Sequence, residues 1–185
     1  MTAPHRTIED ALCVGCGLCC DGTLHSKAAL DPGEADRLGS AELDILDGGQ
    51  TFQMPCPYSK NGCCTAYPNR PAAVCGSYVC KLLRHTKAGE LALEEARGKV
   101  QAAMELRATV AEHNPKAVLA EHRAGIWKSL QAALPSLAPA ERRATGQVIL
   151  DIAVFDEFLD RWFGNRKRKL GTESANSRKD EPDRR

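Results

Sequence analysis

The chain has 185 residues, a length typical of one compact domain or of a small domain with an extension. Its 25 Lys and Arg residues nearly balance 24 Asp and Glu residues, so charge gives no case for nucleic acid or an anionic membrane as partner. No apolar run approaches the ~20 residues that span a bilayer, and residues 1–10 lack the pattern of a secretory signal, so we expect a cytoplasmic protein.

The cysteine content is the most informative feature of the composition. All nine cysteines precede residue 81, and none follows. Free cysteines are often simply buried, but the first half of the chain has too little periodic apolar sequence to need nine for packing. An odd count without an export signal argues against a disulfide framework, and it favours metal or redox chemistry.

The first motif in the chain is the run from Cys13 to Cys20, in which Cys13, Cys16 and Cys19 are separated by two-residue gaps. Such gaps let successive thiolates turn toward one centre, and the intervening glycines allow the positive φ values of a tight loop. Both zinc sites and iron–sulfur clusters use this spacing. Cys19 and Cys20 are adjacent, so the pair could serve two metals, or one member could stay outside the ligand set.

A short helix is predicted next. Asp31 suits an N-cap, Pro32 suits a first turn, and Glu34 stands at the spacing of a capping box. We expect this helix to continue through Leu43 and to break at Gly48-Gly49. After it, the prolines of residues 54–58 predict extended chain, because a residue before proline is pushed out of helical geometry.

A turn is predicted at Lys60-Asn61-Gly62, and the remaining cysteines lie around it. Asn69-Arg70-Pro71 marks the start of a second helix, expected to carry Cys75 and Leu82 on or near one face. Arg70 could balance thiolate charge or bond to backbone carbonyls. Eight thiolates would satisfy two four-cysteine sites, whereas a single site would leave thiols for redox work or packing. The second group of cysteines is Cys56, Cys63, Cys64, Cys75 and Cys80.

The second half reads as helical. Apolar residues recur there at spacings of three and four, and three helices are predicted over residues 90–112, 116–134 and 139–163. Pro115 and Pro135 mark the breaks between them. No glycine-rich phosphate loop, dinucleotide fingerprint or nucleophile elbow is present, so no motif identifies a reaction.

These cysteine motifs resemble the YkgJ-type cysteine-cluster family, which carries a zinc- or iron-chelating CxxCxxCC domain. The resemblance covers residues 11–84: the run from Cys13 to Cys20 matches CxxCxxCC, Cys56-Pro57 matches a Cys-Pro element, and Arg70-Pro71 precedes Cys75 as in the family. It implies metal chelation without a settled reaction. Cys64-Thr65-Ala66-Tyr67 matches the family's Cys-x-x-Tyr, which favours Cys64 over Cys63 as the ligand. The implied metal ligands are Cys13, Cys16, Cys19, Cys20, Cys56, Cys64, Cys75 and Cys80.

We therefore expect a mainly α fold with a cysteine-cluster region pinned by metal. It would comprise residues 1–84, followed by a helical region over residues 85–164 and a disordered charged tail over residues 165–185. The leading hypothesis is a zinc or iron–sulfur protein with a redox or electron-transfer role, and with a protein partner for the helical region. One alternative is an enzyme, either a protein methylase or an oxidoreductase, that uses the metal centre. Another is a metal storage or delivery protein.

Overall fold

The computed structural model describes residues 7–38, 43–66 and 69–164, and helices dominate this part of the chain. Seven α-helices lie in it and 58% of its residues are helical, which confirms the expected mainly α class. None of the described helices is long and apolar enough to cross a membrane. The predicted tail, residues 165–185, lies outside the described residues.

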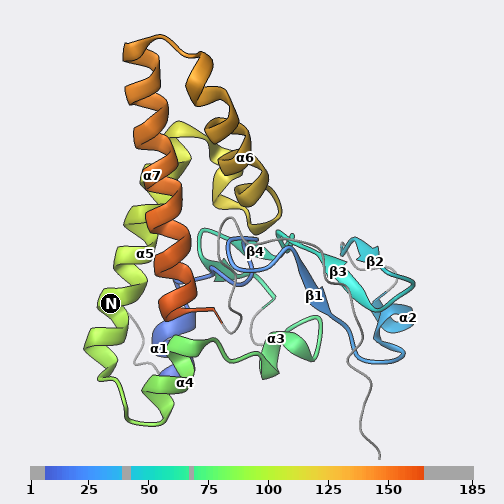
Figure 1. The fold of residues 1–185 in the computed structure, drawn as a ribbon. Coiled ribbons are helices and arrows are strands. Elements are labelled where there is room, and N and C mark those ends of the chain that lie inside the picture. Colours follow the sequence, from blue (N-terminus) through green and yellow to red (C-terminus); the bar gives the residue numbers. More distant parts are fainter. Residues whose placement is uncertain (1–6, 39–42, 67–68, 165–185) are drawn as a thin grey trace, which may run out of the picture.

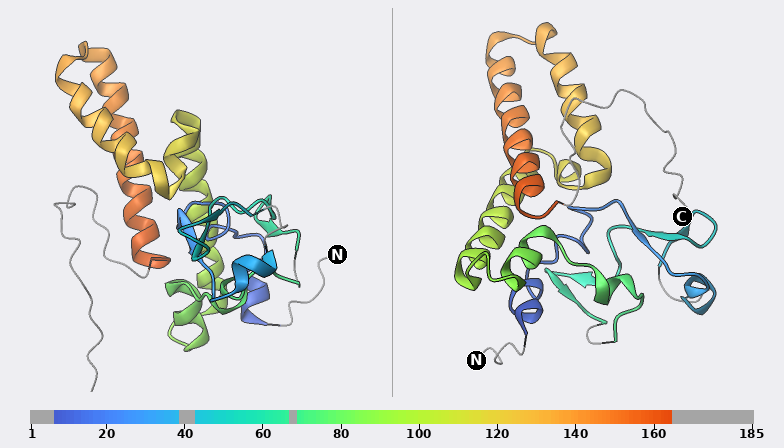
Figure 2. Two further views of the ribbon diagram at one scale, coloured as in Figure 1. Left: turned by 90° about the vertical axis from the view of Figure 1, so that its right-hand side faces the viewer. Right: turned by 60° about the horizontal axis from the view of Figure 1, so that its bottom comes forward.

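The three long helices of the second half lie where the sequence predicts them. They are α5 (Leu93–His113), α6 (Ala120–Ala133) and α7 (Pro139–Trp162), linked by short 3-10 turns η1 (Pro115–Val118) and η2 (Leu134–Ser136). In Figure 1 α5 and α7 run side by side. Figure 2 shows that α6 and α7 form a hairpin whose closed end projects away from the rest of the molecule.

The elements of the first half are short, and several are strands. They are α1 (Ile8–Cys13), β1 (Lys27–Ala29), α2 (Glu34–Leu38), β2 (Ile45–Leu46), β3 (Thr51–Gln53), β4 (Ser59–Lys60), β5 (Cys63–Cys64), α3 (Val74–Ser77) and α4 (Lys81–Lys87).

The main hydrophobic core lies between α5 and α7 and extends into the Cys-rich half. Ile152 and Phe155 of α7 are fully buried there, as the apolar periodicity of the helix predicts. Leu12, Leu18 and Leu82 from the Cys-rich half belong to the same core. The predicted boundary near residue 84 therefore crosses a continuous core, and the division into regions stays a prediction.

A small antiparallel sheet carries a second core. β3 lies between β1 and β2, and Phe52 of β3 stands opposite Ala28 on one side and Ile45 on the other. Phe52 is fully buried and packs with Leu30 and Met54. Cross-strand contacts of this kind are the unit of sheet stabilisation, so even strands of two or three residues form here.

The helix predicted from Asp31 to Gly48 is wrong in its length. Glu34 does accept a hydrogen bond from the Asp31 N–H at 2.9 Å, which is half of the expected capping box. The helix α2 ends at Leu38, however, and Ile45–Leu46 forms β2 because Ile45 pairs with Phe52. Residues 39–42 lie outside the described residues.

Candidate metal centre

The loop that carries the first cysteines begins at the end of α1. Thr7 caps this helix by accepting a hydrogen bond from the Asp10 N–H, and the helix ends at Cys13. The chain then turns twice, with the Cys16 N–H bonded to the Cys13 carbonyl and the Cys20 N–H bonded to the Gly17 carbonyl. Gly15 and Gly17 have φ values of +90° and +64°, which confirms the expected conformation of the loop.

The β4–β5 hairpin packs directly against this loop. Asn61 and Gly62 have positive φ and form its turn, as the sequence predicts. The Gly15 N–H donates to the Gly62 carbonyl at 3.1 Å, and Gly17 lies so close to Gly62 that a Cβ on Gly17 would stand 2.7 Å from the Gly62 Cα. This contact brings Cys64 on β5 to the first cysteine run.

Backbone hydrogen bonds hold Cys56 beside the first cysteine run. Its N–H donates to the Cys20 carbonyl at 2.8 Å, and its carbonyl accepts from the Ser59 N–H at 2.9 Å. Ser59 in turn stands opposite Cys64 across the hairpin. Cys56 is buried, whereas Cys63 is exposed. Successive residues of a strand point to opposite faces, so Cys63 and Cys64 do not share a direction.

The second predicted helix, from Pro71 to Leu82, is wrong because the chain breaks between Ser77 and Lys81. Cys75 lies on α3, while Cys80 is the N-cap of α4 and its thiol accepts a hydrogen bond from the Leu83 N–H at 3.4 Å. Helix α4 lies against α1, and the two are joined by an ion pair between Lys87 and Glu9. The break thus separates Cys80 from Cys75 and turns it toward the end of α1.

The electrostatic effects of the thiols on one another show which of them are neighbours. The Cys80 thiol acts on Cys13 and Cys16, and both of these act on Cys19. A second set of interactions joins Cys20 and Cys64 to Cys56 and Cys75. The two sets meet at the adjacent pair, whose Sγ atoms are 3.7 Å apart, and Cys13 also interacts with Cys20.

Burial keeps most of these thiols protonated in the metal-free protein. It raises the pKa of Cys16 to about 12 and that of Cys13 to about 11, although Cys13 as a whole residue is exposed. Burial is also the main cause that raises the pKa values of Cys56, Cys75 and Cys80. A metal binds the thiolate form, so binding at these thiols would displace protons.

Arg70 supplies positive charge to both sets. Its guanidinium donates to the Cys75 carbonyl at 3.0 Å, and its charge lowers the pKa values of Cys13, Cys20 and Cys75 against the larger effect of burial at Cys13 and Cys75. Of the two roles considered from the sequence, carbonyl bonding is present, and compensation of thiolate charge stays a prediction. At Cys20 the hydrogen bond from Cys19 is the largest effect and lowers the pKa further.

The thiols lie in one region, but the described part of the chain holds no ready-made metal site. Among the described residues, no three His, Cys, Asp or Glu side chains stand close enough together to hold a metal as placed. The donor chemistry nevertheless fits zinc or iron–sulfur, because cysteine is the ligand type most concentrated here and thiolates select these metals. Tyr67, matched to the family pattern, lies outside the described residues.

Sequence reasoning missed the polar residues that anchor the loop after Cys20. The Arg107 Nε atom stands 3.2 Å from both the Asp21 carboxylate and the Thr23 hydroxyl. Arg123 donates to the Thr23 carbonyl and to Asp156 on α7, and its side chain is almost fully buried. A sequence signal existed for Arg123, since it stands three residues before Ile126 on the apolar stripe of its helix.

Tyr78 is a further residue close to the thiols. It stacks edge-on against His25 with ring centroids 4.9 Å apart, and its buried hydroxyl has no hydrogen-bond partner in the described part of the chain. Burial is the main cause that raises the pKa of its hydroxyl, and the nearby thiols of Cys80 and Cys19 raise it further. Tyr78 thus lies near Cys19 and Cys80.

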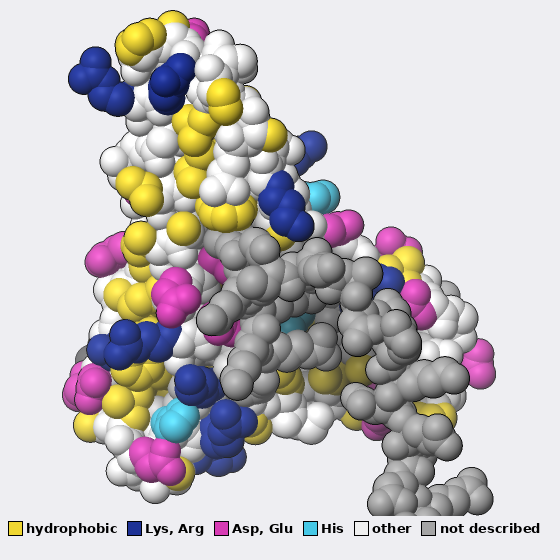
Figure 3. Space-filling view, viewed as in Figure 1, with side chains coloured by type: hydrophobic (Ala, Val, Ile, Leu, Met, Phe, Trp, Pro, Cys, Tyr) yellow, Lys and Arg dark blue, Asp and Glu magenta, His cyan; other side chains and the backbone are white. Residues whose placement is uncertain are grey.

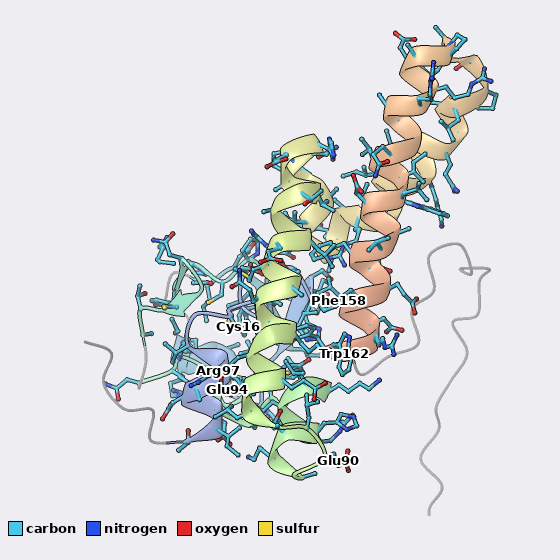
Figure 4. The ribbon with its side chains drawn as sticks, turned by 90° about the vertical axis from the view of Figure 1, so that its left-hand side faces the viewer. Cys16, Glu90, Glu94, Arg97, Phe158 and Trp162 are labelled. Carbon is cyan, nitrogen blue, oxygen red and sulfur yellow. The ribbon has the colours of Figure 1, made fainter. Side chains whose placement is uncertain are left out.

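A shallow groove of about 600 Å³ lies away from the thiols, on the helical region. Phe158 and Trp162 of α7 line it, and Lys99 of α5 lies over the Trp162 ring at 4.4 Å. In Figure 4 these aromatic residues lie on one side of α5 and Cys16 lies on the other. The enzyme hypothesis requires a substrate cavity beside the thiols, and this groove does not supply one.

Comparisons with protein-family models, with curated proteins and with solved structures found no match to this chain.

Proposed function

We propose that this chain is a metal-binding cysteine-cluster protein of the YkgJ type, with zinc or an iron–sulfur cluster held by thiolates. The observation that carries the proposal is the convergence of cysteines from four separate segments, the run from Cys13 to Cys20, Cys56, Cys64 and residues 75–80, on one region of the fold. An apolar core alone does not require so many thiols in one place.

The chain's own residues would hold the metal and control its surroundings. The thiols supply all the ligands, Arg70 offsets part of the negative charge that thiolates bring, and Tyr78 lies near two of the thiols. An iron–sulfur cluster would supply one-electron transfer, which makes a redox role part of the proposal. Zinc would instead cross-link the short elements of the first half.

Location and partner belong to the same proposal. All nine cysteines are free, which suits the reducing cytoplasm. A protein partner is proposed for the helical region, where apolar side chains gather along the projecting hairpin in Figure 3 and Leu150 and Val154 of α7 are more than half exposed.

The test is an anaerobic purification followed by elemental analysis and a visible absorption spectrum of the same sample. We expect stoichiometric zinc, or iron with acid-labile sulfide and absorption that bleaches on reduction. Cys63→Ser is the matched control, because this exposed cysteine should leave metal content unchanged. A protein without stoichiometric metal, all of whose thiols react at once with iodoacetamide, would contradict the proposal.

A further inference from the structure

The cysteines divide between the two hydrophobic cores of the molecule. Cys16 and Cys80 pack against the main core, which α5 and α7 form with Leu12 and Leu18. Cys56 is itself part of the second core, and Cys75 packs against that core. Different helices and strands form the two cores. Cys16 and Cys80 are therefore positioned by one set of elements, and Cys56 and Cys75 by another.

Most of the interactions between thiols follow the same division, and the exceptions, Cys13 and Cys19 with Cys20, involve the adjacent pair. Cys80 acts on Cys13 and Cys16 although more than sixty residues separate them in the sequence, whereas Cys75, only five residues from Cys80, acts with Cys64 on Cys56 instead. Proximity in sequence therefore does not explain the grouping. The break between α3 and α4 does, because it turns Cys80 away from Cys75.

The adjacent pair stands where the two groups meet. Cys19 interacts with Cys13 and Cys16, and its neighbour Cys20 interacts with Cys56, whose N–H is bonded to the Cys20 carbonyl. Two neighbouring side chains that leave the backbone in different directions can each join a different centre. Two adjacent cysteines fit poorly into one tetrahedral site, but they can each supply a ligand to one of two neighbouring sites.

Resting on the proposed metal-binding function, we propose that the chain holds two separate four-thiolate centres and that the division runs between Cys19 and Cys20. Cys63 lies outside both. The first set is Cys13, Cys16, Cys19 and Cys80, and the second set is Cys20, Cys56, Cys64 and Cys75. Four thiolates around Zn²⁺ carry a charge of about −2, and the charge of Arg70, which acts on thiols of both sets, would offset part of the repulsion between two such centres.

The experiment counts zinc on the full chain and on one variant of each set. The protein is stripped of metal, reduced, and reloaded with Zn²⁺ under anaerobic conditions, and native mass spectrometry gives the number of ions per chain. Cys80→Ser is chosen for the first set because serine is a good N-cap and should keep α4 capped. Cys75→Ser is chosen for the second set, and Cys63→Ser is the control.

We expect two zinc ions on the wild type and on Cys63→Ser, one on each single variant, and none on the double variant. Alkylation of the zinc-loaded single variants identifies which thiols are released. In Cys80→Ser, iodoacetamide should label Cys13, Cys16 and Cys19 and leave the second set unlabelled. In Cys75→Ser, it should label the remaining thiols of the second set and leave the first set unlabelled. Far-ultraviolet circular dichroism checks that each variant keeps its helices. The labelling pattern shows which thiols share a centre, even where one variant binds zinc weakly.

Failure of this inference differs from failure of the proposed function. A wild type that binds no zinc and yields no iron centre contradicts metal binding itself. A wild type that binds metal, but whose single variants each lose all of it or expose thiols of both sets equally, contradicts only the division and indicates one shared centre.

Discussion

Arg123 shows how one residue joins the two halves of the molecule. Only 5% of it is exposed, yet it carries a charge, and its guanidinium donates to the carbonyls of Thr23 and Val118 and to Asp156. It also lies over the Phe155 ring at 5.0 Å. A buried charge of this kind is tolerated because its hydrogen bonds are met, and they hold the loop after Cys20 against α6 and α7.

Replacing Arg123 with Met should lower the free energy of unfolding by about 3–5 kcal/mol, because the partly buried Asp156 and the carbonyls of Thr23 and Val118 lose their donor. Urea unfolding followed by circular dichroism measures the change. Arg143→Met, at an exposed position on α7, is the matched control and should change stability by no more than about 0.5 kcal/mol. Equal effects of the two substitutions would show that Arg123 does not join the halves.

Glu34 gives a second link at the residue scale, and this one depends on pH. Its carboxylate accepts the N–H groups of Asp31 and Ala73 at 2.9 and 3.0 Å, which ties α2 to the segment before Cys75. The hydrogen bond from Asp31 is the main cause that lowers the pKa of Glu34 below its ordinary 4.5. The ionised form is therefore the one that stabilises the fold.

Glu34→Gln should destabilise the protein by about 1–2 kcal/mol at pH 7. Because the folded pKa lies below the unfolded value of 4.5, the advantage of the wild type is complete above pH 4.5 and is lost as pH falls through the lower folded pKa. Chemical unfolding at pH 7 and at pH 3 to 4.5 should show the gap between the two proteins closing. A gap that is the same at every pH would contradict this. Glu112→Gln, at an exposed position on α5, is the control for the substitution itself.

At the scale of elements, the contact between the cysteine loop and the β4–β5 hairpin is the tightest approach in the candidate site. Gly17 has φ +64° and leaves no room for a Cβ against Gly62. Gly48, in the turn between β2 and β3, has nearly the same φ of +66° but open space around it. Substitutions at the two glycines therefore distinguish the loss of stability from backbone strain, expected at both, from the loss caused by a steric clash, expected only at Gly17.

Gly48→Ala should lower stability by about 1–2 kcal/mol, the usual cost of a Cβ in the left-handed region. Gly17→Ala should cost clearly more, since the hairpin must also move, and it should speed alkylation of Cys64. Thermal unfolding and a timed iodoacetamide reaction measure the two effects. If both alanine variants melt at the same temperature and Cys64 reacts equally in both, the hairpin is not held by this contact.

The same scale shows how much of the fold the sequence predicts. The long helices α5 and α7 carry apolar stripes over many turns, so their periodicity is clear and their bounds are predicted to within a few residues. Strands of two or three residues, such as Ile45–Leu46, are too short to show a period, and they form only because Phe52, distant in sequence, pairs with them. The break at Cys80 likewise comes from packing of α4 against α1.

For the candidate site, the sequence predicts which residue types matter but not their grouping. The spacing of Cys13, Cys16 and Cys19 indicates a shared neighbourhood, and in the structure Cys13 and Cys16 lie near enough to act electrostatically on Cys19. The partner role of Cys80 cannot be read from spacing, because it arises from a chain reversal over more than sixty residues. Whether these thiols bind metal stays a prediction.

At the scale of the whole molecule, the two cores differ in what supports them. The main core has long helices with a continuous apolar stripe, whereas the second core rests on short strands and on α2, with Cys56 in its interior. On the proposed function, thiolate–metal bonds would supply the support that the second core lacks. The two parts should therefore respond differently to removal of metal.

Treatment of the purified holoprotein with a strong chelator under reducing conditions should destabilise the second core first. Hydrogen–deuterium exchange should show residues 27–38 and 43–66 losing protection, while α5 and α7 remain largely protected because Ile152 and Phe155 stay packed. The untreated protein provides the reference exchange rates. Equal loss of protection in α5 and in the sheet would mean that the molecule unfolds as one unit and that metal supports both cores alike.

The link between Arg123 and Thr23 also fixes an order of events during synthesis. One hundred residues separate the two, so the loop that carries Cys19 and Cys20 leaves the ribosome long before the arginine that holds it. At about 5–20 residues per second, this interval lasts roughly 5–20 s. For that time the thiols belong to an unfinished chain and are open to oxidants and to whichever metal arrives first. On the proposed function, the nascent chain would thus meet its metal supply before it can fold, and the cell's free metal and thiol reductants would decide which ion it keeps.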